Sequence, residues 1–258
     1  KVDQAEAALA VEEDVLQRLF SSSFRERLAA TAQLEPWHVA SGDEFCAVLR
    51  ACASLGRRWA SENNVQVAST GLRFLHVQLR VFLDYSRAEP GGSPTRGDLH
   101  DWVQAAHPGE WSRALASICS AAAARLTDRK STTVARDILH AAVELHSLRF
   151  VLAATIEPFA SAAVASPAAA AAAMAWLSDA LQRWKPAFVG RIDGTEFQDS
   201  RVPGAAIACC AAALRSPAEH TRTAALSALV ALDRHCPVLE AIAAPEHGCS
   251  QSVVSTVR

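Results

Sequence analysis

The chain has 258 residues, half of them hydrophobic, and its 25 basic and 27 acidic side chains give a formal net charge of −2. An apolar fraction this high excludes an intrinsically disordered chain, and the length suits one large domain or two small ones. A slightly acidic chain is also not a broadly basic protein that coats nucleic acid, so any basic surface has to be local.

Nearly all the elements that the sequence predicts are helices. Apolar residues recur at steps of three and four, whereas the alternating Val, Ile and Thr runs of strands are nearly absent. In chain order the apolar stripes are Val65, Ala68, Leu72, Leu75, Leu79 and Phe82; Trp111, Leu115, Ile118, Ala122 and Leu126; Val134, Ile138, Ala141 and Leu145; and Leu226, Leu229 and Val230 with Ala225 and Leu232 beside them.

Short turns separate these helices. Three serines at 21–23 precede a helix predicted to begin at Phe24, and two asparagines precede a helix predicted to begin at Val65. Ser166 is a plausible N-cap for a helix that begins at Pro167, where the missing N–H costs nothing. The segments LTDRKSTTVARDIL and LRSPAEHTRTAALSAL have the same plan of helix, short turn and helix.

The helix pairs occupy about 35 to 45 residues each, which is the size of a HEAT or armadillo repeat. Such hairpins cannot bury their apolar faces alone, so they stack on one another. We therefore predict an all-α, HEAT/armadillo-like α-solenoid of about six hairpins that forms one domain over 1–258, with Gly- and Pro-rich loops at 89–98 and 185–202. The predicted units are 4–36, 43–86, 98–147, 149–184, 203–236 and a weak or truncated 237–258.

In a stack of parallel hairpins, the turns inside the hairpins lie along one edge. The residues that this edge would carry include Phe24 and Arg25 from the first turn, Arg129 and Lys130 from the third, and His220 and Arg222 from the fifth. An acidic chain can in this way present one basic edge.

The order and spacing of these turns resemble those of a TOG domain, the tubulin-binding HEAT-repeat module of microtubule polymerases, of the CLASP family and of ciliary TOG proteins. In that family the first turn typically reads Trp-Lys-x-Arg, and the fourth usually carries Lys and Asn. The matching segments here are Phe24-Arg25-Glu26-Arg27, Asn63-Asn64-Val65, Leu126-Thr127-Asp128-Arg129-Lys130, Trp176-Leu177 and Thr221-Arg222-Thr223-Ala224-Ala225. The chain departs from the family at Phe24, which replaces Trp, and at the fourth turn, which offers only Ser166 and Pro167.

The resemblance implies a non-catalytic module that binds αβ-tubulin or the microtubule lattice and serves microtubule regulation. Phe24 would be the apolar anchor and Val65 a second apolar contact, while the cations would meet acidic tubulin surface. The implied tubulin-binding residues are Phe24, Arg25, Asn64, Val65, Arg129, Lys130, His220 and Arg222. The implied location is the cytoplasm and cytoskeleton, with centrosome or cilium as narrower alternatives, and no cofactor is implied.

Several of these residues have a structural alternative. We expect Arg27 to pair with a carboxylate of the neighbouring repeat, because large cations are seldom buried without a partner. Asp128 is expected to serve as a cap or turn residue. For Asn64, the alternative to binding is that it serves solely as a helix cap. Arg222 fits a contact between repeats as well as it fits binding, whereas Lys130 has no evident structural duty.

The sequence offers little for chemistry. Asp98, His100 and Asp101 lack the ligand spacing of a metal site, and the hydrolase, P-loop and dinucleotide motifs are absent, so we predict a non-enzyme. The odd number of cysteines, seven, without a C-x-x-C pair argues against a disulfide framework or a zinc site. The alternative function is a HEAT or armadillo scaffold that binds another protein and has no affinity for tubulin; no nucleic acid is expected.

Two further expectations concern membranes and chain context. The most apolar run, 159–177, is rich in weakly apolar Ala and is interrupted by Pro167, so we expect packed helices and no membrane span. No signal peptide is visible. Because the chain starts at Lys1 and contains a single Met, Met174, we expect it to be part of a larger multidomain protein.

Overall fold

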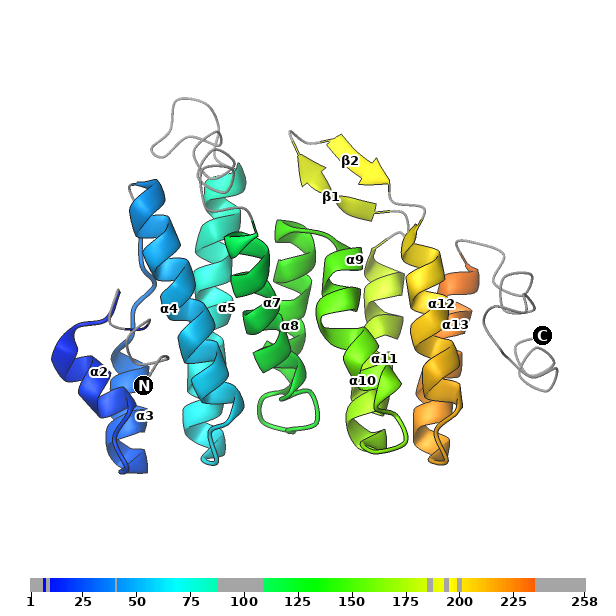
Figure 1. Cartoon of the computed structure of the whole chain (residues 1–258), viewed down its shortest axis with the longest axis horizontal. Helices are drawn as coiled ribbons and strands as arrows, with labels where there is room; N and C mark the ends of the chain where they lie inside the picture. Colours follow the sequence, from blue (N-terminus) through cyan, green and yellow to red (C-terminus); the bar gives the residue numbers. More distant parts are fainter. Residues whose placement is uncertain are drawn as a thin grey trace. The chain divides into compact units, whose positions relative to one another are not determined.

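The computed structural model of the chain describes residues 7, 10–39, 41–87, 109–184, 188–192, 195–198 and 201–234. The chain divides into two compact units, which we call unit 1 (Lys1–Leu145) and unit 2 (His146–Arg258). Figure 1 shows the hairpins of each unit. The loop expected at 89–98, the Asp98, His100 and Asp101 group and the expected partial hairpin 237–258 lie outside the described residues, and the extent of the domain stays a prediction.

Unit 1 consists of three consecutive helix pairs. The bounds of its helices are α2 Glu13–Leu19, α3 Phe24–Gln33, α4 Gly42–Ala60, α5 Val65–Arg87, α7 Glu110–Ala123 and α8 Thr132–Leu145. Within the pairs, α2 packs on α3, α4 on α5 and α7 on α8. Between pairs, α4 packs on α7, and α5 packs on α3 and α8. First helices thus contact first helices and second helices contact second helices, which makes two layers.

Unit 2 contains two helix pairs and a small ribbon. Its elements are α9 Leu148–Val151, the π-helix η1 Leu152–Ile156, α10 Glu157–Ser161, α11 Pro167–Arg183, β1 Phe188–Ile192, β2 Thr195–Gln198, α12 Arg201–Leu214 and α13 Glu219–Asp233. The segment α9-η1-α10 pairs with α11, and α12 pairs with α13, while α11 also packs on α13. The antiparallel ribbon β1–β2, with Ile192 opposite Thr195, occupies the connection that the sequence predicted to be a loop.

The π-helix has a local cause. Pro158 lies in α10, directly after η1. Proline has no N–H to donate to the carbonyl of residue 154, and in a regular α-helix its ring would clash with that carbonyl. A π-turn widens the backbone and relieves that clash. The hydroxyl of Thr155 donates to the carbonyl of Val151 at 2.6 Å within the same segment. The first helix of this hairpin is therefore divided into α9, the π-turn η1 and α10.

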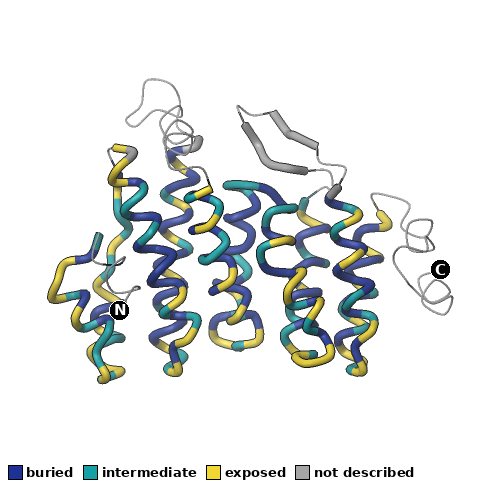
Figure 2. The backbone as a smooth tube through the Cα atoms, viewed as in Figure 1, coloured by how far each residue is buried: buried dark blue, intermediate teal, exposed yellow. Residues whose placement is uncertain are grey.

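The predicted helix starts agree with the structure. Helices begin at Phe24, Val65 and Pro167, as the turn residues indicated, and the remaining two second helices begin at Thr132 and Glu219. Ser166 occupies the N-cap position of α11, although its side chain makes no capping hydrogen bond. Most residues of the predicted apolar stripes are buried, although Val65, Leu145 and Leu226 are half-buried, and many of the exposed residues lie in the turns (Figure 2).

Aromatic side chains fill the core of unit 1. The ring centroids of Phe45 and Phe82 lie 5.2 Å apart, and Phe45 lies 5.6 Å from Trp111. Gly71 allows the closest approach, because a Cβ there would lie 2.1 Å from the buried indole of Trp59. The glycine is therefore required by packing between α4 and α5.

One predicted stripe is wrong in part. Val230 was placed on the buried face of the last helix, but its side chain is 50% exposed. Ala225, Leu229 and Leu232 are buried, and at 100° per residue Val230 points more than about 100° away from their common direction. The spacing of Ala225, Leu229 and Leu232 alone, four and then three, defines the buried face.

The described part of the chain includes five of the cysteines and the helices that can be compared with a membrane span. The five cysteines described there form no disulfide, and burial raises the pKa of Cys119 and Cys209 to about 12, which favours the protonated thiol at neutral pH. Among the helices described, none combines the length and apolarity that crossing a bilayer requires.

Candidate functional site

The turns inside the hairpins of unit 1 lie together at one end of its helices, along the lower edge of that unit in Figure 1. We call them turn 1 (residues 20–23), turn 2 (61–64) and turn 3 (124–131), after the gaps between the helices. Unit 2 has two such turns at one end of its own helices, turn 4 (162–166) and turn 5 (215–218).

Turn 1 exposes an aromatic ring. Phe24 is the first residue of α3 and is 45% exposed, and Arg25 beside it is exposed as well. The hydroxyl of Ser21 accepts the N–H of Ser23 at 3.0 Å and donates to the carboxylate of Glu26. This short hydrogen-bonded turn holds the start of α3, so Phe24 projects from a fixed backbone.

Arg27 fixes turn 1 to turn 2. Its Nε and Nη2 donate to the carboxylate of Glu62 at 2.8 and 3.0 Å, and its Nη1 donates to the carbonyls of Ser21 and Ser22, both at 2.8 Å. The side chains of Arg27 and Glu62 are only 13% and 2% exposed. The predicted pairing of Arg27 with a carboxylate of the neighbouring repeat is confirmed, and this cation is occupied within the protein.

Glu62 lies at the centre of turn 2. Besides Arg27, its carboxylate accepts the N–H of Asn64 at 2.9 Å and pairs with Arg58 at 3.0 Å. Burial alone would raise the pKa of this carboxyl, but the hydrogen bonds from Arg27 and Asn64 and the charge of Arg58 outweigh burial, so the pKa of Glu62 is lowered. The carboxylate is therefore ionised at neutral pH.

Asn64 and Val65 begin α5. The Oδ1 atom of Asn64 accepts the N–H groups of Gln66 and Val67 at 3.0 and 3.2 Å, which is an N-cap. The capping role considered for Asn64 is thereby confirmed. Val65 is half-buried and keeps part of its surface open beside this cap.

Turn 3 exposes two cations. Arg129 and Lys130 are both exposed. The Asp128 carboxylate accepts the backbone N–H of Lys130 at 3.1 Å and the hydroxyl of Ser131 at 3.3 Å. The turn role predicted for Asp128 is therefore confirmed, and Asp128 fixes the backbone from which Arg129 and Lys130 project.

Direct contacts bring the three turns of unit 1 together. Nη2 of Arg125 in turn 3 donates to the carbonyl of Glu62 in turn 2 and to that of Trp59 at 2.9 Å. The hydroxyl of Ser69 on α5 donates to the carbonyl of Lys130 at 3.4 Å. With the Arg27–Glu62 pair, these bonds place Phe24, Val65 and Lys130 on successive linked turns.

Turns 4 and 5 of unit 2 are joined by hydroxyl groups. The side chain of Ser216 donates to the carbonyl of Ala163 at 3.0 Å, and Thr221 donates to the carbonyl of Pro167 at 2.8 Å. His220 is exposed at the start of α13. The expected single row that would add His220 and Arg222 to the unit 1 residues spans both units and stays a prediction.

Arg222 repeats the geometry of Arg27. Its Nη1 donates to the carbonyls of Ser216 and Pro217, six and five residues earlier, at 3.0 and 2.7 Å. In both turns the first serine also accepts the N–H two residues later, at 3.3 Å for Ala218 in turn 5. Arg222 thus closes its own turn, which is a structural duty that the sequence left open.

The two arginine-closed turns carry different tips. Counting from the arginine, Glu219 stands where turn 1 has Phe24, and His220 stands where turn 1 has Arg25. All four side chains are exposed. The same backbone therefore presents an aromatic ring and a cation in unit 1, but a carboxylate and an imidazole in unit 2.

Turn 4 exposes an apolar residue that was not predicted. Val164 is 65% exposed, and its neighbour Ala165 is exposed as well. The sequence pattern singled out only Ser166 and Pro167 in this turn. The signal that could have found it is local: a β-branched apolar residue three positions before a helix-starting proline lies in a turn and cannot reach a helix face.

Two solved structures have an architecture similar to that of this chain. A Drosophila melanogaster Mini spindles TOG3 structure superposes with a TM-score of 0.58, 18% identity, and coverage of 86% of this chain and 82% of that one. A structure from work on microtubule plus-end tracking by XMAP215, CLIP-170 and EB1 superposes with a TM-score of 0.59, 12% identity, and coverage of 95% and 90%. The chain has the fold of a TOG domain. No family model and no curated protein matches it.

The TOG fold confirms the predicted all-α, HEAT-like solenoid class. At identities this low, the similarity establishes the fold and leaves the partner to be inferred from the surface.

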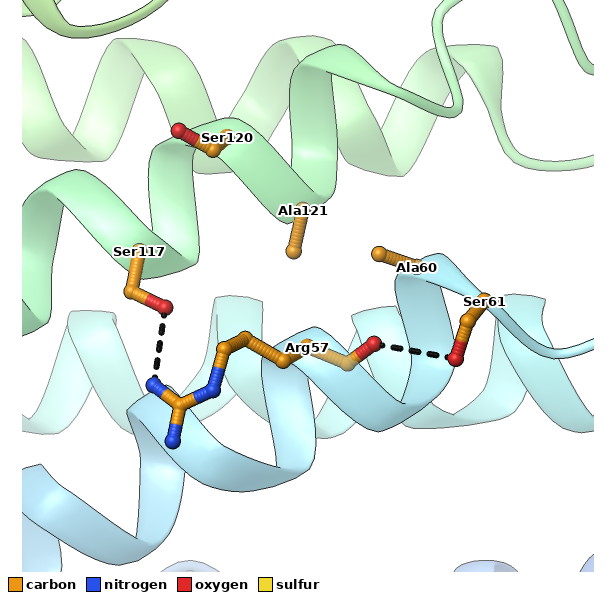
Figure 3. A pocket seen from close by; sticks show the side chains of 6 residues that line it. All are labelled: Arg57, Ala60, Ser61, Ser117, Ser120 and Ala121. Atoms are coloured by element: carbon orange, nitrogen blue, oxygen red, sulfur yellow. Dashed lines mark hydrogen bonds between the residues drawn. The ribbon is translucent and has the colours of Figure 1, made fainter. Parts of the chain in front are cut away.

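One shallow depression lies between α4 and α7 and reaches Ser61 at the start of turn 2. Its volume is about 470 Å³, and it is lined by Arg57, Ala60, Ser61, Ser117, Ser120 and Ala121. Figure 3 shows the side chain of Arg57 crossing the depression toward Ser117, whose hydroxyl accepts a hydrogen bond from Nη1 of Arg57 at 3.3 Å. Small side chains and hydroxyls of this kind form a groove between helices, and within the described residues no cluster of metal-binding groups accompanies it.

Proposed function

We propose that the chain is a non-catalytic module that binds αβ-tubulin or the microtubule lattice through the turns inside its hairpins. The contact residues proposed for unit 1 are Phe24, Arg25, Asn64, Val65, Arg129 and Lys130, and those for unit 2 are His220 and Arg222. One of the two similar structures comes from work on microtubule plus-end tracking, and both share this TOG fold. The cytoskeleton is the location that this function implies.

The exposure of Phe24 is the observation that carries the proposal. A phenylalanine is usually buried, yet Phe24 is 45% exposed at the tip of an ordered turn. An exposed aromatic ring among charged neighbours is typical of the anchor residues that dominate binding energy at protein interfaces. Had Phe24 been buried, the first turn would have had no apolar anchor.

The charges around Phe24 suit an acidic partner surface. Arg25, Arg129 and Lys130 are exposed cations on turns 1 and 3, whereas Arg27 and Arg125 are occupied by Glu62. Exposed charges act mainly on the association rate and are screened over about 8 Å at physiological ionic strength. Binding should therefore weaken as salt increases, while the contribution of the aromatic ring remains.

The direct test is co-sedimentation with microtubules together with size-exclusion chromatography with αβ-tubulin. We expect the wild-type chain to bind in at least one assay, and the Phe24→Glu, Lys130→Ala double variant to bind at least about tenfold more weakly, because it removes an anchor and a charge. If the double variant binds as the wild type does, the assignment of the site is wrong.

The chain offers a matched control on the same unit. Val77 is 44% exposed and Arg80 is exposed, both on α5 and about 18 Å or more along the helix from turn 2. The Val77→Glu, Arg80→Ala double variant makes the same changes in polarity and charge away from the turns. It should bind as the wild type does, and weakening by both double variants would indicate a general effect of charge.

A different outcome would favour the alternative scaffold function. If the folded wild-type chain binds neither microtubules nor αβ-tubulin, the TOG fold serves another protein partner in this case. The same pair of variants then remains useful, because a partner that uses the exposed turns is lost with Phe24→Glu and retained with Val77→Glu.

A further inference from the structure

The Glu62 carboxylate accepts three hydrogen bonds and pairs with a further cation. Arg27 supplies two donors, Arg58 one and the backbone of Asn64 one, all within 3.0 Å. The side chain is 2% exposed, so none of these bonds is shared with bulk water. Its backbone carbonyl in addition accepts Nη2 of Arg125. We call Arg27, Arg58, Glu62, Asn64 and Arg125 the Glu62 network.

Each bridging member of this network fixes the backbone that carries one proposed contact residue. Arg27 holds the carbonyls of turn 1, from which Phe24 projects, and Asn64 caps the helix that begins at Val65. Arg125 contacts Glu62 and lies 3.9 Å from the Asp128 carboxylate, which in turn holds the N–H of Lys130. The carboxylate of Glu62 therefore joins turns 1 and 2, and its backbone carbonyl joins turn 3 through Arg125, so the backbones that carry Phe24, Val65 and Lys130 are linked at one buried residue.

Stability alone does not explain this arrangement. Replacing a buried ion pair by apolar side chains of similar size is often neutral or stabilising, because desolvation offsets the attraction. A buried, fully satisfied polar network does, however, specify one geometry of the groups attached to it. Loops that are ordered before binding lose less conformational entropy on binding, so fixed turns bind more tightly than mobile ones.

We propose that Glu62 is a positioning residue, which holds turns 1, 2 and 3 in the register with which unit 1 contacts an acidic protein surface. This inference rests on the proposed function for its partner, but the coupling of the turns is a property of the free chain. Glu62 itself touches no partner, since it is buried beneath the turns that do.

The experiment compares two variants of unit 1, each of which changes a buried polar side chain that hydrogen-bonds a neighbouring segment. Glu62→Gln keeps the size of the side chain and removes its charge. Gln78→Leu is the matched control: Gln78 is fully buried on α5, accepts the N–H of Trp37 at 2.7 Å and donates to its carbonyl at 3.0 Å, about 20 Å along the helix from turn 2. Both changes should lower the melting temperature, but only one touches the turns.

Hydrogen–deuterium exchange of the free chain is the first readout. In Glu62→Gln the amides of turns 1 and 2 should exchange about tenfold faster together, because the carboxylate ties both turns, whereas turn 3 stays bonded through Arg125 to the backbone carbonyls of Glu62 and Trp59. In Gln78→Leu those amides should keep the wild-type rate. If Glu62→Gln changes only turn 2, or if Gln78→Leu loosens turns 1 and 2 equally, the inference is wrong whatever the partner is.

Binding to microtubules is the second readout, measured below the unfolding range of every variant. Glu62→Gln should weaken binding about fivefold, and the coupling between Phe24→Ala and Lys130→Ala in a double-mutant cycle should disappear in that background. Gln78→Leu should retain both the affinity and the coupling. Wild-type coupling that persists in Glu62→Gln would overturn the positioning role.

Two further results separate the possible failures. If Glu62→Gln does not fold, Arg27→Lys takes its place, because lysine keeps the charge but cannot hold the carboxylate and both carbonyls of turn 1 at once. Faster amide exchange in turns 1 and 2 of that variant then supports the inference, and unchanged exchange opposes it. If the wild type binds no tubulin at all, the proposed function fails and the binding role of Glu62 fails with it, whereas coupled exchange of the turns would still show that the network links them.

Discussion

Turn 1 and turn 5 are built by the same device but differ in what they present and in how they are supported. In each, an arginine at the fourth position of the second helix donates to two carbonyls five and six residues earlier. Turn 1 then continues into a buried ion pair between Arg27 and Glu62, whereas turn 5 is joined to its neighbour by the hydroxyls of Ser216 and Thr221.

This difference shows that the closing of a turn and its chemistry are set by separate residues. The arginine and the serine determine the backbone, because they satisfy carbonyl and amide groups that a helix end leaves open. The two residues at the start of the helix are free to vary, so Phe24 and Arg25 in one turn correspond to Glu219 and His220 in the other. The supporting contacts also decide how each turn responds to mutation and pH.

The largest expected effect is on the arginines. Arg27→Ala removes two donors from a carboxylate that is 2% exposed, so we expect unit 1 to lose about 3 kcal/mol of unfolding free energy. Arg222→Ala removes two bonds to carbonyls in a turn that is partly open to water, and should cost about 1 kcal/mol. Equilibrium urea unfolding measures both. Equal losses would contradict the separate roles given to the two supports.

The hydroxyls of unit 2 come next. Thr221 is fully buried and donates to the carbonyl of Pro167, so Thr221→Val keeps the shape and removes that hydrogen bond. We expect a loss of about 1.5 kcal/mol, against about 0.5 kcal/mol or less for Thr223→Val on the exposed side of the same helix. Urea unfolding at constant ionic strength measures the pair, and an equal effect of the two would exclude a special role for the Thr221 bond.

The pH dependence should separate the two turns further. The pKa of Glu62 is lowered from 4.5 in the folded state, so its contribution is fully present above that value and is lost as the pH falls through the folded pKa. The cations that face the carboxylate are Arg27 and Arg58. The wild type should therefore lose about 1 kcal/mol more than Glu62→Gln between neutral pH and the acid side of this transition. Urea midpoints measured at both ends of that range test the sign, and parallel pH profiles would contradict it.

The smallest effect is expected when turn 5 is given the exposed residues that follow turn 1. Glu219→Phe with His220→Arg gives turn 5 the tip of turn 1 on a backbone closed in the same way. If the turns contact an acidic surface, microtubule affinity should rise about threefold, since a carboxylate is replaced by an aromatic ring and a cation is added. Co-sedimentation measures it, with Arg234→Phe beyond the end of α13 as a control for added apolar surface. A decrease would indicate that turn 5 contacts a basic or neutral surface.

Local sequence rules predicted a large part of the fold. Serine, asparagine and proline at the turns located the beginnings of α3, α5 and α11, because caps and prolines satisfy or omit the amides that a helix start leaves unpaired. The ribbon β1–β2 was missed because its two strands are only five and four residues long, too short for an alternating pattern to stand out. Val230 was misassigned because a stripe counted from one neighbouring pair, Leu229 and Val230, does not define a face.

The candidate site was predicted less completely. The pairing of Arg27 and the turn role of Asp128 could be inferred, since a large cation needs a carboxylate and an aspartate in a turn binds nearby amides. Glu62 could not be singled out, because its role depends on Arg27, thirty-five residues earlier, and on Arg125, sixty-three residues later. Val164 was passed over since the resemblance directed attention to the charged positions of the turn.

The sequence by itself determined the helices, their pairing into hairpins and the identity of the turn residues, because these follow from interactions among residues close together in the chain. Only the tertiary structure decided which side chains are exposed and which are occupied. Phe24 and Arg27 stand three residues apart, yet the first projects into solvent and the second is bound by Glu62. That outcome depends on which distant carboxylate is brought within reach when the hairpins pack, and no local pattern encodes it.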